Sequence, residues 1–417
     1  MIVNRAQRAA EDIVRTLRNA GQVAYFAGGC VRDLLLGVEP KDFDVATDAP
    51  PERVMALFRR TEQVGAQFGV VLVRSRGIQI EVATFRTDGH YADGRHPDSV
   101  EFGNEFDDAR RRDFTINGMY FDPASGRFID HVGGRADLKD KLIRAIGDPE
   151  LRFQEDHLRL LRAVRFAARL GFAIHDDTFA AIKRHAHRLP AISPERVRKE
   201  LRLILCHPAR ADGWRLLVDS GLSDTIVGGV TWSPSEVAAV AERLANMTEY
   251  AGFGLVLAVI FRAIAPEVAA KACRSLRCSN VETAGVAWML AQLPRVQKPA
   301  NLETADIKLL LADSRFEELL ELLRVDLLAD ARPPHPYQML RERCAAIPPD
   351  QVSPAPLITG TDLLDRGVPQ GPQYARILDA IYRAQLNEEI NDQSEALIRL
   401  EDMLKPIGPS TDESLGQ

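Results

Sequence analysis

The chain has 417 residues, enough for two or more domains with their own cores, and its 46% hydrophobic and 27% charged residues are typical of ordinary soluble proteins. No apolar run approaches the about 20 residues that cross a bilayer, and the first residues lack a signal-peptide layout, so we expect a cytoplasmic protein without membrane contact. The net charge of −6 excludes a general nucleic-acid coat. The five cysteines are scattered and contain no Cys-x-x-Cys pair, which argues against a disulfide framework or a structural zinc site.

The first predicted elements form a phosphate site. Residues 4–19 have the stripe of small and aliphatic side chains typical of an amphipathic helix that covers a sheet. The apolar run 23–27 then predicts a strand. Gly28 and Gly29 allow the chain to bend sharply and bring backbone N–H groups close to an anion, and Arg32 follows within reach of the same anion.

Asp42 and Asp44 lie two positions apart in a stretch that is predicted to be a strand. Side chains two apart share one face, so the two carboxylates would lie side by side while Phe43 and Val45 point into the core. A divalent cation such as Mg²⁺ would relieve the repulsion between them. A Gly-Gly turn or an Asp-x-Asp pair alone is usually a plain turn or a solvated strand face, but in this order they indicate phosphoryl transfer.

Two further strands, 70–74 and 78–85, are predicted to form a hairpin through Ser75-Arg76-Gly77. On the second strand, Glu81 is either a third carboxylate beside the aspartates or an exposed strand residue. Residues 86–98 are polar and irregular, and they are predicted to form a mobile loop rather than a strand.

These motifs resemble a known family. The pattern Gly28-Gly29-x-Val31-Arg32-Asp33-x-x-Leu36-Gly37, followed by Asp42-x-Asp44-x-x-Thr47, is similar to the first motif of the bacterial class II CCA-adding tRNA nucleotidyltransferases and poly(A) polymerases, in the polymerase-beta-like superfamily. The resemblance implies that Asp42 and Asp44 are the catalytic residues and metal ligands. In the family, the loop that matches 86–98 is flexible and helps the site change from C to A addition, but here His96 stands where a second arginine is usual.

A run of three arginines, 110–112, would be a solvated charge run in most proteins. Here Asp113-Phe114-Thr115-Ile116-Asn117 follows directly, and the whole stretch resembles the second motif of the same family. In that motif the arginine and aspartate contact the nucleotide and its ribose. The resemblance therefore implies that Arg112, Asp113 and Asn117 bind the nucleotide.

Residues 155–170 are strongly helical in composition. A spacing of three places Asp156, Arg159 and Arg162 on one polar stripe, a pattern that alone predicts only an i,i+3 salt bridge. Cytosine and adenine each present an amine donor next to a ring-nitrogen acceptor, so a fixed aspartate beside a fixed arginine complements both and mismatches uracil and guanine. The stretch also matches the fourth family motif, in which the aspartate and arginine choose the base.

Helical patterns fill the rest of the chain, and residues 183–202 are basic, which indicates either a face for a phosphate backbone or a solvated surface. We expect an α/β N-terminal polymerase-beta-like nucleotidyltransferase domain, a small mixed sheet with helices, followed by an all-α neck, body and tail. The expected limits are 1–145 for the catalytic head, 146–220 for a neck that selects the nucleobase and contacts RNA, 221–345 for the body and 346–417 for a tRNA-binding tail.

The sequence thus predicts template-independent addition of C and A to the 3′ end of tRNA. The substrates would be CTP and ATP, the cofactor Mg²⁺ and the leaving group pyrophosphate, and no obligate protein partner is implied. A poly(A) polymerase, or a partial enzyme that adds only CC or only A, stays open as an alternative. The alternative of a different class is a noncatalytic tRNA-binding protein, which would not need both Asp42 and Asp44 together with Asp156 and Arg159.

Overall fold

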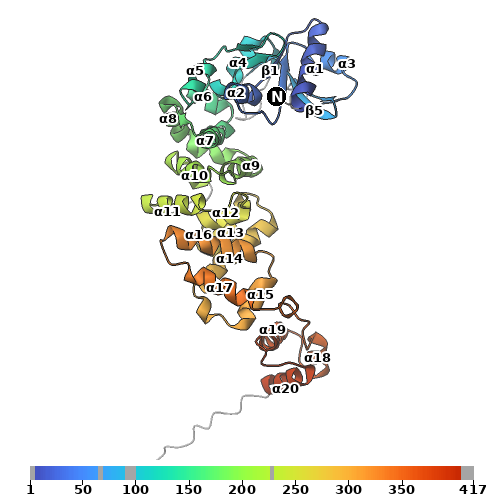
Figure 1. Ribbon diagram of the computed structural model, residues 1–417, viewed down its shortest axis with the longest axis vertical. Coiled ribbons are helices and arrows are strands. Elements are labelled where there is room, and N and C mark those ends of the chain that lie inside the picture. Colours follow the sequence, from blue (N-terminus) through green and yellow to red (C-terminus); the bar gives the residue numbers. More distant parts are fainter. Residues whose placement is uncertain (1–4, 64–68, 90–99, 226–229, 405–417) are drawn as a thin grey trace, which may run out of the picture. The chain divides into compact units, whose positions relative to one another are not determined.

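The computed structural model describes residues 5–63, 69–89, 100–225 and 230–404 (Figure 1). The chain divides into two compact units. The first takes residues 1–245, 249–256 and 271–280, and the second takes 246–248, 257–270 and 281–417. The four domain limits expected from the sequence stay predictions.

A seven-stranded mixed sheet forms the centre of the N-terminal part of the first unit, with the order β3-β4-β5-β2-β1-β8-β9. Its strands are β1 (Ala24–Ala27), β2 (Asp44–Thr47), β3 (Thr61–Gln63), β4 (Val70–Ser75), β5 (Ile78–Thr84), β8 (Tyr120–Asp122) and β9 (Arg127–Ile129). Strands β2 and β5 pair in parallel, and the other neighbours are antiparallel. The expected small mixed sheet and the expected hairpin of β4 and β5 are confirmed.

Helices cover both faces of this sheet. The elements involved are α1 (Arg5–Asn19), α2 (Gly29–Leu35), α3 (Pro51–Leu57), α4 (Glu105–Arg111), the 3₁₀ turn η2 (Thr115–Asn117) and α5 (Gly134–Lys139). On β1 the side chains alternate: Phe26 packs with Ile13 of α1 in one buried cluster, whereas Tyr25 packs with Ala109 of α4 in the other. The face that packs against α4 is the one that carries the site described below.

The expected irregular loop 86–98 is wrong for its first three residues. Strand β6 (Arg86–Asp88) pairs antiparallel with β7 (Val100–Phe102) in a separate two-stranded sheet. The hydrogen bonds of β6 come from a partner that lies beyond the loop, so local composition could not reveal this strand. Residues 90–99, which include His96, lie outside the described residues.

The predicted helix 155–170 is two helices. In this part of the first unit the helices are α6 (Pro149–Glu155), α7 (Leu158–Leu170), α8 (Asp176–His185), α9 (Pro194–Leu205), α10 (Arg210–Asp219) and α11 (Pro234–Ala245). The two-residue strands β10 (Leu142–Ile143) and β11 (Ala173–Ile174) pair in parallel beside them. Asp156 lies in the break with φ −144° and ψ 105°, an extended conformation. Its Oδ1 accepts a hydrogen bond from the backbone N–H of Leu158 at 3.0 Å, which satisfies one of the free donors at the start of α7.

The remaining α-helices in the described residues are α12 (Phe253–Ile260), α13 (Pro266–Ser275), α14 (Asn280–Val296), α15 (Thr304–Ala312), α16 (Phe316–Ala329), α17 (His335–Ala345), α18 (Gly360–Asp365), α19 (Pro372–Leu386) and α20 (Gln393–Leu404). After the head the described chain is mostly helical, as expected, although the two-residue strand β11 shows that it is not strictly all-α. Within the second unit, Arg383 of α19 donates to Asp306 of α15 at 2.6 Å, and Asn387 Oδ1 accepts from the backbone N–H of Ala305 at 2.7 Å. The last helices are thereby joined to α15.

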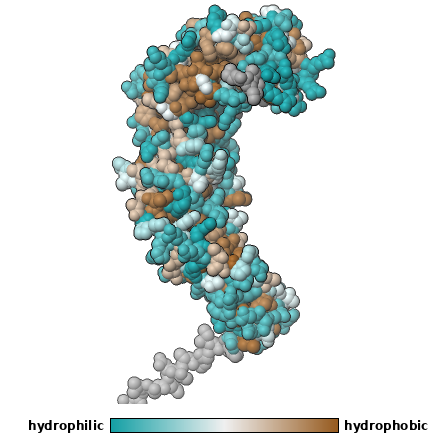
Figure 2. Space-filling model, in the orientation of Figure 1, coloured by the Kyte–Doolittle hydropathy of each residue, from teal (hydrophilic) through white to brown (hydrophobic). Residues whose placement is uncertain are grey.

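Hydrophilic residues cover much of the face drawn in Figure 2, and hydrophobic residues occupy separate patches on it. Within the described ranges, no helix combines the length and the apolar character that a membrane span requires.

Candidate active site

A cavity of about 490 Å³ lies in the first unit between the sheet and the neck helices. Its lining residues are Gly28, Gly29, Arg32, Asp44, Arg111, Arg112, Asp113, Asn117, Asp156, Leu158, Arg159, Arg162, Phe166 and Arg196. Every residue that the sequence predicts to bind a nucleotide lines this cavity, and so does Asp44, whereas Asp42 does not. Arginines outnumber aspartates on its wall, and a cavity with such a surplus of positive charge attracts a polyanion.

Gly28 makes the sharp bend between β1 and α2 that the sequence predicts. Its φ of 73° and ψ of −134° suit glycine and strain other residues. A Cβ atom at this position would lie 3.5 Å from Arg112 Nη1 and 3.8 Å from Asp44 Oδ2. The backbone at Gly28 therefore runs directly beside an arginine and a carboxylate of the cavity wall.

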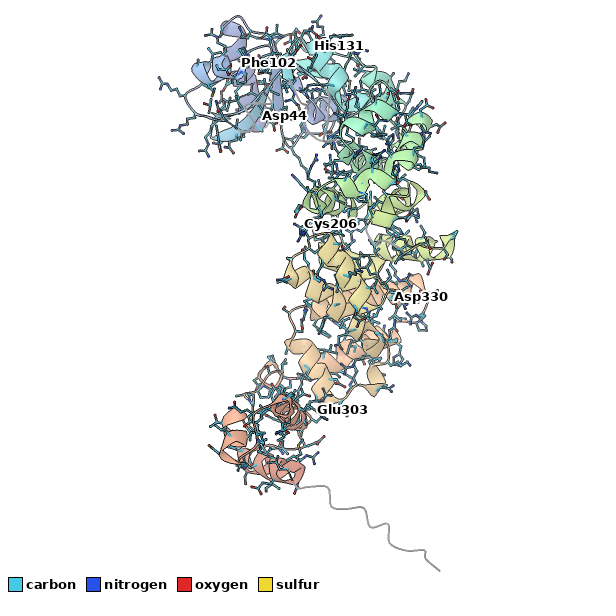
Figure 3. All side chains as sticks on the ribbon, turned by 180° about the vertical axis from the view of Figure 1, so that it is seen from behind. Asp44, Phe102, His131, Cys206, Glu303 and Asp330 are labelled. Carbon is cyan, nitrogen blue, oxygen red and sulfur yellow. The ribbon has the colours of Figure 1, made fainter. Side chains whose placement is uncertain are left out.

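Asp44 is the first residue of β2, and Figure 3 labels it in the sheet-containing part of the first unit. Phe43 and Val45 are 2% and 0% exposed, whereas Asp42 and Asp44 are exposed. The predicted alternation is therefore confirmed, although Asp42 precedes the strand rather than belonging to it.

Glu81 fits both alternatives that the sequence left open, because its side chain is exposed and it also neighbours Asp44, so its role as a third carboxylate stays a prediction. It lies opposite Asp44 in the parallel pairing of β2 with β5, so it stands beside the aspartates. Asp44 is open to the solvent, but the surrounding protein atoms exclude part of its water. This desolvation, with the negative charges of Glu81 and Asp42, outweighs the effect of Arg112 and raises the pKa of Asp44 to about 6.

The carboxylate oxygens at this site are suitable ligands for a divalent cation. A carboxylate such as Asp44, whose pKa is raised partly by neighbouring negative charges, is stabilised in its charged form when a cation binds beside it. In the described part of the chain, no three His, Cys, Asp or Glu side chains converge on a ready-made metal site. Mg²⁺ commonly uses one or two carboxylates plus the phosphates of a substrate, and Asp42 and Asp44 suit a metal that is held in this way.

Asp108 is a site residue that the sequence reasoning missed. Its carboxylate is 1% exposed and accepts hydrogen bonds from Arg111 Nε at 2.8 Å, Arg112 Nη2 at 2.9 Å and Tyr120 Oη at 2.7 Å. Burial alone would raise its pKa, but the charges of Arg112 and Arg111 and the hydrogen bond from Tyr120 lower the pKa to about 2. One buried anion therefore holds two arginines of the cavity wall.

A chain of hydrogen bonds joins the residues of the second motif to both sides of the cavity. Arg32 Nη1 donates to Asn117 Oδ1 at 2.8 Å, and Asn117 Nδ2 donates to Asp113 Oδ1 at 3.4 Å. Asp113 Oδ2 accepts from Arg162 Nε at 2.8 Å and from Nη2 at 2.5 Å. Burial would raise the pKa of Asp113, but the Arg162 guanidinium lowers it below its usual value. Asp113 therefore stays ionised.

The stripe expected from Asp156, Arg159 and Arg162 is wrong, because Asp156 lies before α7. Each of the three residues forms an ion pair with a different partner. Asp156 Oδ2 accepts from Arg196 Nη2 of α9 at 3.1 Å, while Arg159 Nη1 donates to Glu155 Oε2 at 2.5 Å. The three side chains nevertheless line one cavity, as the functional interpretation requires.

Phe166 was also missed, and Arg196 was predicted only as part of the basic segment 183–202, not as a residue of this cavity. The Phe166 ring contacts the guanidinium groups of Arg32, Arg162 and Arg165, with 5.5, 5.4 and 4.6 Å between each guanidinium carbon and the ring centroid. An aromatic face attracts cations and keeps these mutually repelling groups in place. Phe166 had the helical spacing of an ordinary core residue, so no sequence signal distinguished it.

Family models match three parts of the chain. The model of the poly A polymerase head domain matches residues 24–144, a model of an RNA- and SrmB-binding site of polymerase A matches 171–230, and a model of tRNA nucleotidyltransferase domain 2 matches 254–400. The CCA-adding enzyme of Geobacillus thermodenitrificans is 36% identical over 397 residues, which covers 93% of this chain and 95% of that enzyme.

The chain belongs to the family of CCA-adding enzymes.

Solved structures agree with this membership. The Bacillus stearothermophilus CCA-adding enzyme, in complex with CTP, has a TM-score of 0.75 and 32% identity, and the match covers 96% of this chain and 98% of that one. The Thermotoga maritima CCA-adding enzyme, complexed with a tRNA, has a TM-score of 0.66 at 20% identity over 97% of both chains, a likeness that shows the fold. CCA-adding enzymes are nucleotidyltransferases, and such enzymes generally use divalent metal ions.

Proposed function

We propose that the protein adds C and A nucleotides to the 3′ end of tRNA without a nucleic-acid template, using CTP and ATP and releasing pyrophosphate. The observation that carries this proposal is the arginine-lined cavity that brings Asp44, the second-motif residues and Asp156 together. Membership of the CCA-adding enzyme family supports the same conclusion.

Asp42 and Asp44 are proposed as the catalytic residues and metal ligands, with Mg²⁺ as the metal. When bound, Mg²⁺ would neutralise phosphate charge and make the α-phosphate more open to attack by the tRNA 3′ hydroxyl. Glu81 is proposed to support the site through its negative charge beside Asp44.

The phosphates and ribose are proposed to bind along the wall of the head. Gly28 and Gly29 are proposed to bring backbone N–H groups close to the phosphates at the start of α2, and Arg32 and Arg112 supply positive charge. Asp113 and Asn117, already joined by a hydrogen bond, are proposed to hold the ribose and the adjoining part of the nucleotide. Arg32 is held by Asn117 and Arg112 by Asp108 before the substrate arrives, which reduces the cost of ordering these two side chains.

Base choice is proposed for Asp156, Arg159 and Arg162. An aspartate accepts a hydrogen bond from the exocyclic amine that C and A share, and an arginine donates to the adjacent ring nitrogen. Asp156 is held by Arg196, and Arg159 by Glu155, so the bound base would exchange or extend these contacts. Asp156→Ala should relax the choice between CTP and UTP while phosphoryl transfer continues; unchanged selectivity would contradict this role.

The RNA is proposed to contact the basic segment 183–202, where Lys183, Arg188 and Lys199 are exposed. The 346–417 region is proposed as a further tRNA contact. The cytoplasmic location predicted from the sequence belongs to this proposal too, and no obligate protein partner is part of it.

The test uses purified protein and tRNA that ends before CCA, before the final A, or after complete CCA, each with labelled CTP or ATP. Products are sized on a gel. We expect two C additions to the first substrate, one A addition to the second, and none to the third. Long A tracts would show a poly(A) polymerase, and growth of only one substrate would show a partial enzyme. Binding without incorporation would show a noncatalytic tRNA-binding protein, and the proposed function would then be wrong.

A further inference from the structure

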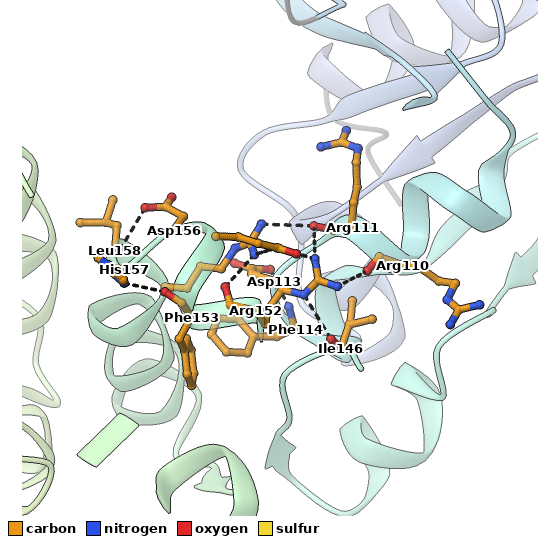
Figure 4. A network of polar contacts seen from close by, with 12 residues as sticks. Arg110, Arg111, Asp113, Phe114, Ile146, Arg152, Phe153, Asp156, His157 and Leu158 are labelled. Atoms are coloured by element: carbon orange, nitrogen blue, oxygen red, sulfur yellow. Dashed lines mark hydrogen bonds and ion pairs between the residues drawn. The ribbon is translucent and has the colours of Figure 1, made fainter. Parts of the chain in front are cut away.

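Arg152, in the last turn of α6, binds three backbone carbonyls with one guanidinium (Figure 4). Its Nε donates to the carbonyl of Ile146 at 3.2 Å, Nη1 to that of Arg111 at 3.2 Å and Nη2 to that of Arg110 at 2.9 Å. Its side chain is 15% exposed, and it is not among the residues that line the cavity. Arg152 therefore contacts the framework of the site rather than the space for the nucleotide.

Two of these carbonyls belong to the end of α4. The last carbonyls of a helix lack partners within the helix and carry its negative dipole end, so a cation stabilises them. The side chains of Arg111 and Arg112 enter the cavity from this same helix end. By holding the carbonyls of Arg110 and Arg111, Arg152 fixes the backbone from which two cavity arginines project.

The other contacts of Arg152 lead to the residues proposed to choose the base. Its Nη1 donates to Glu155 Oε2 at 2.8 Å, and the same oxygen accepts from Arg159 Nη1 at 2.5 Å. Arg159 Nη1 also donates to the backbone carbonyl of Arg152 at 2.9 Å, and Arg159 Nη2 donates to the carbonyl of Arg111 at 3.2 Å. Arg152, Glu155, Arg159 and the end of α4 thus form one connected network.

We propose that Arg152 is a positioning residue. It holds the base-selecting residues of the neck in a fixed position relative to the arginines at the end of α4. It acts through Glu155 and Arg159 on one side and through the Arg110 and Arg111 carbonyls on the other. The inference rests on the proposed function, because it names the residue that aligns the two sides of that same site.

Alignment and mere stability have different kinetic consequences. A correctly paired base helps catalysis only if it fixes the α-phosphate relative to the attacking hydroxyl. If the two sides of the site lose their alignment, kcat should therefore fall more for the correct nucleotide than for a mispaired one. A purely structural arginine changes only the amount of folded enzyme. That amount cancels in the ratio of kcat/KM for CTP to kcat/KM for UTP, so this ratio separates the two roles.

The experiment compares the full-length wild type with Arg152→Met and Arg152→Lys, using tRNA that ends before CCA. The matched control is Arg18→Met, which removes an ion pair with Asp122 and a hydrogen bond to the carbonyl of Ala24 in the head, away from the cavity. Initial rates give kcat and KM separately for CTP and UTP, and thermal melting gives the stability of each variant.

We expect Arg152→Met to lower the CTP-to-UTP ratio about tenfold, mainly through kcat for CTP. Lysine keeps the charge but has a single nitrogen that cannot reach all three carbonyls, so Arg152→Lys should recover much of the melting temperature and only part of the ratio. Arg18→Met should lower the melting temperature and leave the ratio unchanged.

A ratio for Arg152→Met within about twofold of the wild type overturns the positioning role. If Arg152→Met does not fold, the same criterion is applied to Arg152→Lys. Failure of the wild type to incorporate CTP overturns the proposed function itself, whereas normal wild-type incorporation with unchanged ratios in the variants overturns only the role of Arg152.

Discussion

Replacing Asp108 by asparagine removes the buried negative charge that Arg111, Arg112 and Tyr120 share. The pKa of this carboxyl falls from an ordinary 3.8 to about 2, and at about 1.36 kcal/mol per pKa unit the difference corresponds to about 2 kcal/mol of stabilisation. The about 3–5 kcal/mol lost when one partner of a fully buried pair is removed describes this same interaction, so it is not added to the first value. Because the side chains of Arg111 and Arg112 are 21% and 18% exposed, the cost here lies toward the lower end. We therefore expect Asp108→Asn to destabilise the surroundings of α4 by about 2–4 kcal/mol at pH 7.

Hydrogen exchange followed by mass spectrometry is the suitable assay, because it reports local opening in a large chain that need not unfold in one step. A loss of about 2 kcal/mol corresponds to about thirtyfold faster exchange in peptides from α4 and β8. Peptides from α14–α16, in the second unit, serve as the internal control and should exchange at the wild-type rate.

The effect should depend on pH in a defined direction. Because the folded-state pKa of Asp108 is depressed, its stabilisation is fully present above the ordinary value of 3.8 and is lost as the pH falls through about 2. The ratio of mutant to wild-type exchange rates, in which intrinsic pH effects cancel, should therefore be constant from pH 7 to about 4 and shrink below it. A ratio near one at pH 7, or one that does not change down to pH 2, would refute this account.

Three further predictions concern the site and its support. Chelation of divalent metal should stop CTP incorporation and excess Mg²⁺ should restore it, whereas Asp44→Asn should stay inactive with Mg²⁺; a gel assay of labelled tRNA distinguishes these outcomes. Phe166→Leu should raise KM for CTP about tenfold through lost cation–π contacts, and Phe166→Trp should not, as initial rates would show. Gly134→Ala should lower the melting temperature by several degrees, because its Cβ would lie 2.2 Å from the carbonyl oxygen of Thr115; Gly254→Ala, where no atom lies within 4 Å, is the control and should not lower it.

The strand that begins at Asp44 was predictable because the pattern that defines it is local. Alternation over Asp42 to Val45 and the turn at Gly28 determine which side chains face outward, and the structure confirms both. The parallel pairing that places Glu81 beside Asp44 was not predictable from local pattern, since it joins strands separated by α3, β3 and β4.

The errors have a common physical cause. Residues 155–170 contain no glycine or proline, so propensity predicts an unbroken helix, yet partners distant in the sequence stabilise a break at Asp156. Asp108 sits in an acidic helix turn, where an i,i+4 pair with an arginine is usually solvated and weak. Only its burial against β8 makes this pair strong, and burial is a tertiary property.

The contacts of Arg159 bear on how this enzyme could change over evolutionary time. The guanidinium proposed to choose the base also donates to the backbone carbonyls of Arg111 and Arg152, which a substitution would leave without that donor. A mutation that opened the site to other nucleotides would thus weaken the protein in the same step. Drift in base preference is opposed by folding stability as well as by selection for mature tRNA. A redesigned specificity would first need a new donor for the Arg152 carbonyl, since the Arg111 carbonyl also accepts from Arg152 Nη1.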